Sequence, residues 1–271
     1  MIFERVKQVT KRGLPSALFE IMLIFIGISL ALAFDNWNTE RNARALEKEY
    51  LQSIYTNLEN NFKQIDDNMT FNANGYLKSA WNVSNFVKGE AFNEATLLTD
   101  FQSSGSYKTL SLETSGYTSI RSYGLHILKS PQLRVAIVEL HDRHFDRLLN
   151  VWEGLVVRKA ATELFAPIRM EYGDFTREFN SANEWREYLQ DKRPLRNMYV
   201  RVINNFGNAI NNTVPYLRKI HVVMEQLEQA LKIKSNQQER LKRIEFWEWE
   251  AANDWPISDP MQQIPKDEQT H

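Results

Sequence analysis

The chain has 271 residues, with 33 lysines and arginines against 34 aspartates and glutamates, so its formal net charge is -1. A chain of this length can bury a hydrophobic core, and its balanced charge excludes a bulk electrostatic attraction to nucleic acid. Glycine (10) and proline (8) are sparse and cysteine is absent, so we predict an all-α fold without disulfides rather than a sandwich or barrel.

Residues 1–13 form a basic tail with an apolar side. The apolar side chains share one helical face and are Ile2, Phe3, Val6 and Val9. The basic residues around the other face are Arg5, Lys7, Lys11 and Arg12. This pattern favours a short amphipathic helix in the lipid headgroup region, with a bend at Gly13 and Pro15. A frayed basic tail accounts for the same residues equally well.

Residues 14–37 are predicted to form a transmembrane helix, and Glu20 is the one charged residue in its apolar part, Leu14–Phe34. At ~1.5 Å per residue, a helix here is long enough to cross the hydrocarbon core of a bilayer. Trp37 lies where interfacial aromatic residues gather. A cleaved signal peptide is the competing interpretation, because Ala31-Leu32-Ala33 resembles a cleavage site. The charge inside the stretch and the bulky Phe34 favour a transmembrane helix that is retained.

Two features of the predicted span suggest contacts with other helices. Gly27 with Ala31, and Ser29 with Ala33, are pairs of small residues four apart, which allow close approach of a neighbouring helix. Glu20 lies about one turn inside the membrane edge, where a carboxylate is costly unless it is hydrated or paired. It either reaches back to the interface or faces a partner helix or pore.

The run from Glu20 to Asn38 resembles the signature of an uncharacterised family of bacterial single-pass membrane proteins. The residues that carry this resemblance are Glu20, Ile26-Gly27-Ile28, Ala31-Leu32 and Asn36-Trp37-Asn38. A second similarity covers Ser115-Gly116 through Leu133-Arg134 and the helix that follows to Phe145. The resemblance implies a membrane-anchored helical protein and no assigned activity. We therefore expect a bacterial inner-membrane protein, and the positive-inside rule favours a cytoplasmic N-terminus and a periplasmic C-terminal domain.

Residues 38–252 are predicted to form a soluble helical domain. A helix over 38–88 carries a coiled-coil-like apolar seam, interrupted at Asn61, with Gly75 and Gly89 as break or end points. Further short helices are expected over 93–101 and 182–190, and residues 107–128 are the least regular part. Residues 253–271 are predicted to be a flexible tail.

Two more long helices complete the predicted domain. One begins at Ser130-Pro131, a strong helix start, and runs to Phe165. The other runs from Pro194 to Ala252 with a bend at Pro215. Together with the first helix they predict an up-and-down bundle in which the final helix returns toward the membrane.

Two side-chain groups are the remaining candidate sites. The aromatic residues near the end of the last helix are Phe246, Trp247, Trp249 and Trp255. They suggest membrane or partner docking, although capping of the bundle is the interpretation we favour. His141 and His144 are spaced as metal ligands can be, but neighbouring arginines are more typical of a solvated face. We expect no metal, no cofactor and no catalytic residues.

These features predict a membrane-anchored structural or interaction protein. We expect it to be either a self-assembling scaffold or an accessory subunit of a larger membrane complex. The lipid bilayer is its first expected partner, and a second copy or another membrane protein is the next. The alternative is an extracytoplasmic helical bundle that senses a ligand and signals through a partner.

Overall fold

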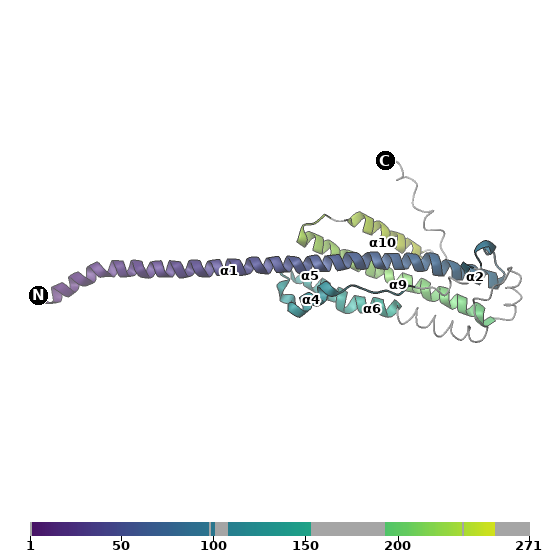
Figure 1. Cartoon of the computed structure of the whole chain (residues 1–271), viewed down its shortest axis with the longest axis horizontal. Helices are drawn as coiled ribbons and strands as arrows, with labels where there is room; N and C mark the ends of the chain where they lie inside the picture. Colours follow the sequence, from purple (N-terminus) through teal and green to yellow (C-terminus); the bar gives the residue numbers. More distant parts are fainter. Residues whose placement is uncertain (1, 98, 101–107, 153–192, 235, 253–271) are drawn as a thin grey trace, which may run out of the picture. The chain divides into compact units, whose positions relative to one another are not determined.

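The computed structural model describes residues 2–97, 99–100, 108–152, 193–234 and 236–252. Within these ranges the chain forms helices and connecting segments and no β-strand, which confirms the all-α prediction. The chain divides into two compact units, Met1–Tyr50 and a second unit that begins at Leu51. Figure 1 shows the helices of both units in sequence colours.

Helix α1 (Ile2–Phe71) provides the whole of the first unit. It includes a window of mean hydropathy 2.2, long and apolar enough to cross a membrane. α1 continues through Gly13 and Pro15, where the sequence predicts a bend, and Pro15 is tolerated with the loss of one backbone hydrogen bond. The basic residues Arg5, Lys7, Lys11 and Arg12 lie on α1, and their side chains fall outside the described part.

Beyond α1 the helical path continues through a π-helical turn, η1 (Asn72–Leu77), into α2 (Lys78–Lys88). Gly75 lies inside this wider turn, and Gly89 ends α2 with a left-handed φ of 79°. Glycine adopts that conformation without the steric penalty that other residues meet. Both glycines therefore mark the irregularities that the sequence predicts.

The middle of the chain is built from short elements. The first are the 3-10 turn η2 (Glu94–Thr96), helix α4 (Ser115–Tyr123) and the 3-10 turn η3 (Leu125–Ile127). Helix α5 (Pro131–Glu139), the π-helical turn η4 (Leu140–Phe145) and α6 (Asp146–Asn150) then form one continuous tract.

The start of that tract is as predicted, while the region before it is more regular than expected. Ser130 Oγ accepts a hydrogen bond from the Leu133 amide at 3.2 Å, so Ser130 is the predicted N-cap.

The expected end of the helix at Phe165 and the short helix over 182–190 lie outside the described residues. Residues 115–123 form a helix where we predicted irregular structure, because Gly116 lies within the first turn rather than between elements.

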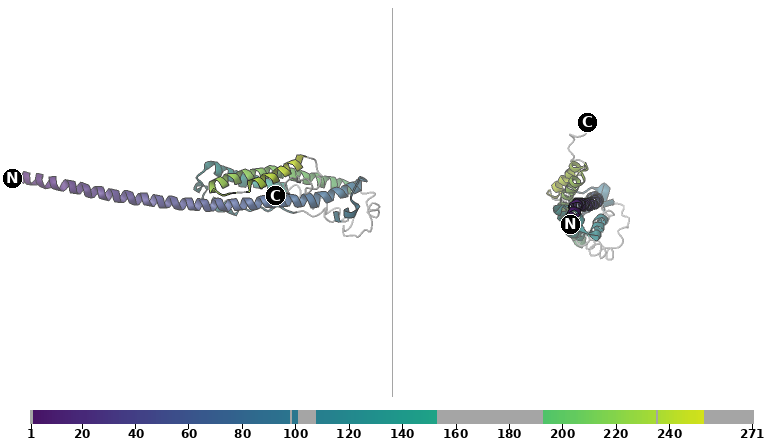
Figure 2. Two further views of the ribbon diagram at one scale, coloured as in Figure 1. Left: turned by 90° about the horizontal axis from the view of Figure 1, so that it is seen from above. Right: turned by 90° about the vertical axis from the view of Figure 1, so that its left-hand side faces the viewer.

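Helices α9 (Arg193–Leu231) and α10 (Gln237–Ala252) form an antiparallel pair, drawn side by side in Figures 1 and 2. The prediction of one helix to Ala252 is wrong: the chain reverses at Lys232, whose φ is 57°. Two ion pairs fix the register: Arg218 with Glu248 at 2.7 Å, and Glu228 with Arg240 at 2.6 Å. Pro215 lies inside α9.

The core of the second unit is formed where α1, the α5–α6 tract and the α9–α10 pair meet. The apolar seam of α1 is confirmed, since its members are all buried: Leu51, Ile54, Leu58, Phe62, Ile65 and Met69. Trp152 and Trp247 are among the largest fully buried side chains. The indole N–H of Trp152 donates to Thr213 Oγ1 at 2.9 Å and so ties the end of the α5–α6 tract to α9.

Candidate functional site

The apolar part of α1 is exposed on every side. All residues from Leu18 to Asn42 are exposed within the structure, including Phe25 at 72% and Phe34 at 66%. A helix that is apolar all round and not covered by the described part of the chain is typical of a membrane span. Trp37 is exposed at the polar end of this stretch, with the Arg41 guanidinium 5.6 Å from its ring centroid.

The two small-residue pairs lie on opposite sides of α1. At about 100° per residue, Glu20, Gly27 and Ala31 fall within roughly 40° of one another around the helix axis. Ser29 and Ala33 lie on the other side by the same arithmetic. A Cβ atom built on Gly27 has no neighbour within 4 Å, so the Gly27 surface is open to another helix. Glu20 is exposed and shares this open side, which we call the Glu20 face.

A second candidate site lies in the bundle, where a row of amide side chains projects from one side of α1 and from the first residue of η1. Four asparagines of this row, Asn57, Asn61, Asn68 and Asn72, are buried. They hold the non-helical segment Lys108–Thr114 and the first turn of α4 by hydrogen bonds to backbone groups. We call these residues the asparagine ladder.

The ladder binds backbone groups of the segment, and Asn57 also bonds the side chains of Glu113 and Ser115. Asn61 Nδ2 donates to the Glu113 carbonyl at 2.8 Å, and its Oδ1 accepts from the Glu113 amide at 2.7 Å. Asn68 donates to the Thr109 carbonyl at 2.9 Å. Asn72 Oδ1 accepts from the Lys108 amide, and Asn57 Oδ1 accepts from the Gly116 amide at 2.7 Å. A carboxamide can satisfy one donor and one acceptor of a peptide at once, as Asn61 does.

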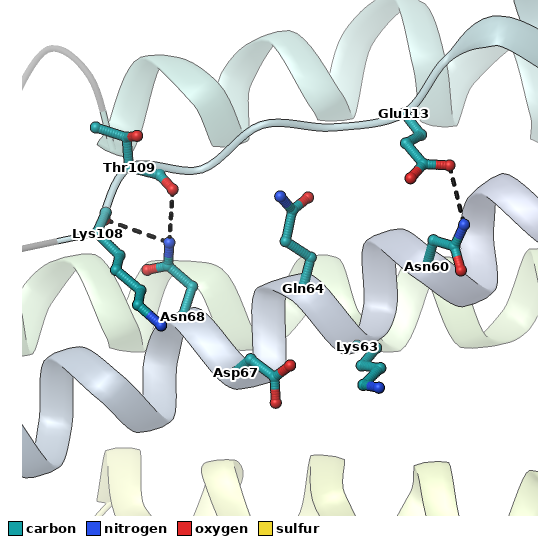
Figure 3. Close-up of a pocket in the computed structure, with 8 residues that line it drawn as sticks. All are labelled: Asn60, Lys63, Gln64, Asp67, Asn68, Lys108, Thr109 and Glu113. Atoms are coloured by element: carbon teal, nitrogen blue, oxygen red, sulfur yellow. Dashed lines mark hydrogen bonds between the residues drawn. The ribbon is translucent and has the colours of Figure 1, made fainter.

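An open groove of about 650 Å³ lies between α1 and this segment, as Figure 3 shows. Its lining is polar and carries both signs of charge: Asn60, Lys63, Gln64, Asp67, Asn68, Lys108, Thr109 and Glu113. In Figure 3 the Gln64 side chain points toward the segment, between the bonded positions of Asn60 and Asn68. Asn60 donates to the Glu113 carboxylate at 3.0 Å.

A buried polar cluster joins α1, α9 and α10. Glu228 accepts hydrogen bonds from Tyr55 at 3.2 Å and from Arg240 at 2.6 Å, and both members of the ion pair are buried. Arg240 Nε also donates to His221 Nδ1 at 3.4 Å, which requires a neutral imidazole. Burial lowers the pKa of His221 and favours that neutral form. The cluster fixes how the α9–α10 pair packs on α1.

The two candidate metal histidines face different surroundings. His141 is buried in the π-helical turn η4 and stacks on Tyr117 with ring centroids 4.4 Å apart. Its Nδ1 lies 2.9 Å from the Ile137 carbonyl, and burial lowers its pKa. His144 instead contacts the Lys219 ammonium at 3.1 Å. No group of three or more potential ligands surrounds either histidine among the described residues.

The aromatic residues near the end of α10 differ in how far the fold buries them. Trp247 is buried, and its indole N–H donates to Asp66 at 2.6 Å; Asp66 also forms an ion pair with Arg243 at 2.7 Å. Phe246 packs edge-on against Trp247, with ring centroids 5.0 Å apart, while Trp249 is 45% exposed. Trp255 lies outside the described residues.

The direction of α10 differs from the sequence prediction. Tyr55 meets the start of α10 through Glu228, and Asp66 meets its later residues Arg243 and Trp247. α10 therefore runs in the same direction as the Tyr55–Asp66 part of α1 that it packs against, whereas the final helix was predicted to run back along the first. The reversal at Lys232 causes the difference.

The sequence analysis did not predict the ladder, since it treated Asn61 only as an interruption of the apolar seam. A signal was present: Asn57, Asn61 and Asn68 lie on the same side as the apolar seam at helical spacing, where a solvated face has no reason to be. What they bind could not be inferred, because the segment at Lys108 is remote in sequence.

The fold and sites define an all-helical protein with one candidate membrane span among its described residues, followed by a helical bundle. The chain belongs to the family of unknown function DUF6090, whose model matches residues 20–187. The matched range begins at Glu20 and includes the asparagine ladder and the segment that it holds. Neither a curated protein nor a solved structure matches the chain significantly.

Proposed function

We propose that this protein is a single-pass membrane protein that acts by assembly, as an accessory subunit or scaffold of a larger membrane complex. The observation that carries this proposal is the exposure of every apolar side chain from Leu18 to Phe34. That surface is satisfied only by lipid and by other transmembrane helices.

We further propose that the N-terminus lies in the cytoplasm and the helical domain in the periplasm of a bacterial inner membrane. The four basic residues before the span support this orientation through the positive-inside rule. The interfacial position of Trp37 is consistent with a span that ends near that residue.

The Glu20 face favours a different subunit over a parallel second copy. Parallel self-association through this face would bring two Glu20 carboxylates together, which the low dielectric of the membrane disfavours. A partner helix with a basic or hydrogen-bond-donating side chain at that depth would pair with Glu20, while Gly27 and Ala31 allow its backbone to approach. The accessory-subunit form of the proposal is therefore the one that the charge distribution supports.

The proposal is tested by the mass of the assembly extracted gently from native membranes and captured through a C-terminal tag. We expect a defined complex with stoichiometric partner subunits. A lone monomer under conditions that preserve other membrane complexes would contradict the proposal. A defined homo-oligomer would retain assembly as the function and contradict the accessory-subunit form.

Two matched variants show whether the Glu20 face makes the contact. Ala31→Leu adds bulk on this face, and Ala33→Leu makes the same change on the opposite side of α1. We expect Ala31→Leu to release the partner and Ala33→Leu to retain it. Equal retention in both variants would exclude this face as the contact.

A further inference from the structure

The buried polar cluster that joins α1, α9 and α10 contains a histidine, His221, packed against a permanent cation. The His221 side chain is 3% exposed, and the Arg240 guanidinium beside it is 7% exposed. Arg240 Nε donates to His221 Nδ1 at 3.4 Å, and Arg240 Nη2 donates to Glu228 at 2.6 Å. Because a guanidinium can only donate, Nδ1 of His221 is the acceptor, and the imidazole is neutral in this packing.

The second ring nitrogen of His221 fixes where its proton lies. Nε2 lies 3.5 Å from the Glu225 carboxylate, which is four residues further along α9. Since Nδ1 accepts from Arg240, the proton of the neutral ring is on Nε2, on the side of Glu225. A second proton would add an N–H group at Nδ1 against the Arg240 Nε–H. The hydrogen bond would then become a contact between two donors and two buried positive charges.

The other charged groups around His221 compensate only partly for a second cation. Those that act on it directly, or through Glu228, among the described residues are Arg218, Glu225 and Glu228 on α9, Arg240 on α10, and Tyr55 and Glu59 on α1. Glu228 already accepts hydrogen bonds from three side chains. Glu225 is half-buried, so solvent screens its attraction to the imidazole. Burial is the larger effect, and it lowers the pKa of His221.

The contact between His221 and Arg240 lies at the start of α10. Gln237, the first residue of α10, donates to Glu228 at 2.8 Å, and Arg240 follows about one turn later. The later part of α10 is held separately, by hydrogen bonds and an ion pair to Asp66 of α1. Protonation of His221 therefore acts on the first turns of α10 and leaves the contacts at Asp66 in place.

We propose that His221 is an acid-sensitive switch: when its imidazole gains a proton, Arg240 is displaced and the start of α10 separates from α9 and α1. The closed cluster favours the neutral imidazole. The stability that this provides is complete above the usual histidine pKa of about 6.5 and is lost as the pH falls below it. The inference goes beyond the proposed assembly function, because it concerns the bundle alone.

Glu250, near the other end of α10, responds to pH in the opposite direction. Burial raises its pKa to about 7, so acid stabilises the packing of its uncharged carboxyl. A separation of α10 in acid therefore has the sign expected of His221 and the wrong sign for Glu250.

The test is hydrogen–deuterium exchange of the full chain in lipid nanodiscs at pH 7.5 and pH 5.5. The amides of residues 241–245 report the start of α10, and those of residues 58–66 report the part of α1 beneath the bundle. Division by the intrinsic exchange rate at each pH gives the opening constant of each segment. We expect that of 241–245 to rise at least about threefold at pH 5.5, where one histidine can supply at most about tenfold. The constant of 58–66 should change less than about twofold, because α1 stays folded.

Two matched variants assign the response to His221. His221→Asn cannot be protonated but keeps an acceptor near the position of Nδ1, so the rise should vanish. His126→Asn makes the same change at an exposed histidine of η3, outside the cluster, and the rise should remain. His141 and His144 are present in both variants and cannot cause a difference between them. If circular dichroism shows that His221→Asn has lost helix content, His221→Gln replaces it.

Three results would overturn the proposal. They are an unchanged opening constant of 241–245 in acid, an equal rise in the folded His221 variant, and a rise in 58–66 that matches that of α10, which would show unfolding of the whole bundle. Loss of the rise in His126→Asn would also overturn it, since that residue is outside the cluster. The outcome is separable from the proposed function, because the mass of the native assembly is measured at neutral pH, where the switch is closed.

Discussion

Single amide side chains decide how the segment Lys108–Thr114 is held on α1. Asn61 is completely buried, yet its donor and acceptor are both satisfied by Glu113. Burial of an amide is favourable only with such partners, because an unpaired buried polar group costs about 1–3 kcal/mol. The asparagines of α1 therefore specify the position of the segment, while the apolar seam provides the larger part of the burial energy.

Asn61→Ala should lower the free energy of unfolding by about 2 kcal/mol, because two hydrogen bonds are lost and the Glu113 backbone is left unpaired. Asn60→Ala is the matched control, since the Asn60 side chain is exposed and its one hydrogen bond among the described residues is to the Glu113 carboxylate. We expect its effect to be below about 0.5 kcal/mol. Urea unfolding in nanodiscs measures both values, and equal losses would show that the buried pair has no special role.

Glu250 makes the stability of the bundle depend on pH, and its contribution falls as the pH rises. Its side chain is buried, one carboxylate oxygen has no hydrogen-bond partner among the described residues, and burial raises its pKa to about 7 from 4.5. The folded state therefore holds the proton more tightly than the unfolded state does. The stability that this group contributes is complete below about pH 4.5 and is lost as pH rises through 7.

Glu250→Gln should consequently stabilise the fold at pH 8 by about 1–2 kcal/mol, and the gain should vanish toward pH 4.5. Glu248→Gln is the control with the opposite sign. Glu248 is partly exposed, and its hydrogen bonds with Arg218 lower its pKa, so its loss should slightly destabilise the fold at pH 8. Thermal unfolding across pH 4.5–8 tests both, and a pH-independent gain in Glu250→Gln would contradict the titration.

At the scale of elements, close approach of α4 to α1 depends on one glycine. A Cβ atom on Gly116 would lie 2.8 Å from the Ile54 amide nitrogen and from the Ser53 carbonyl carbon, both of which are backbone atoms. The Gly116 amide also donates to Asn57 at 2.7 Å. The first turn of α4 therefore packs directly on the backbone of α1.

Gly116→Ala should destabilise the fold by about 1–3 kcal/mol, because α4 must move away from α1 and strain its bond to Asn57. Gly75→Ala is the contrasting variant, since a Cβ there has no neighbour within 4 Å and the residue is helical. It should stabilise the fold by about 0.5–1 kcal/mol. The two unfolding midpoints should move in opposite directions, and a shift of both in one direction would contradict the close contact.

The elements also show which features a sequence can predict. The seam of α1, the N-cap at Ser130 and the end of α2 at Gly89 follow from local patterns, because each depends on residues within a few turns. The reversal at Lys232 could not be predicted in this way, since the 3.6-residue apolar period continues on both sides of it. The ladder depends on contacts between residues remote in sequence, such as Asn61 with Glu113, which no local pattern encodes.

At the scale of the whole molecule, the exposed apolar helix and the bundle must occupy different surroundings. The absence of cysteine allows single cysteines to report those surroundings without background. Thr10→Cys precedes the span and Gln52→Cys follows it, at an exposed position of α1. The proposed orientation places the first in the cytoplasm and the second in the periplasm.

A membrane-impermeant maleimide added to intact spheroplasts should label Gln52→Cys at once and Thr10→Cys only after lysis. The maleimide modifies any cysteine thiolate that it can reach. The order of labelling therefore reports which side of the membrane each cysteine faces, rather than a difference in thiol reactivity. The reverse order would place the bundle in the cytoplasm and would require partners on that side. Loss of an N-terminal tag, together with release of the chain from the membrane, would identify residues 1–33 as a cleaved signal, and the assembly proposed for the Glu20 face would then have no helix to form it.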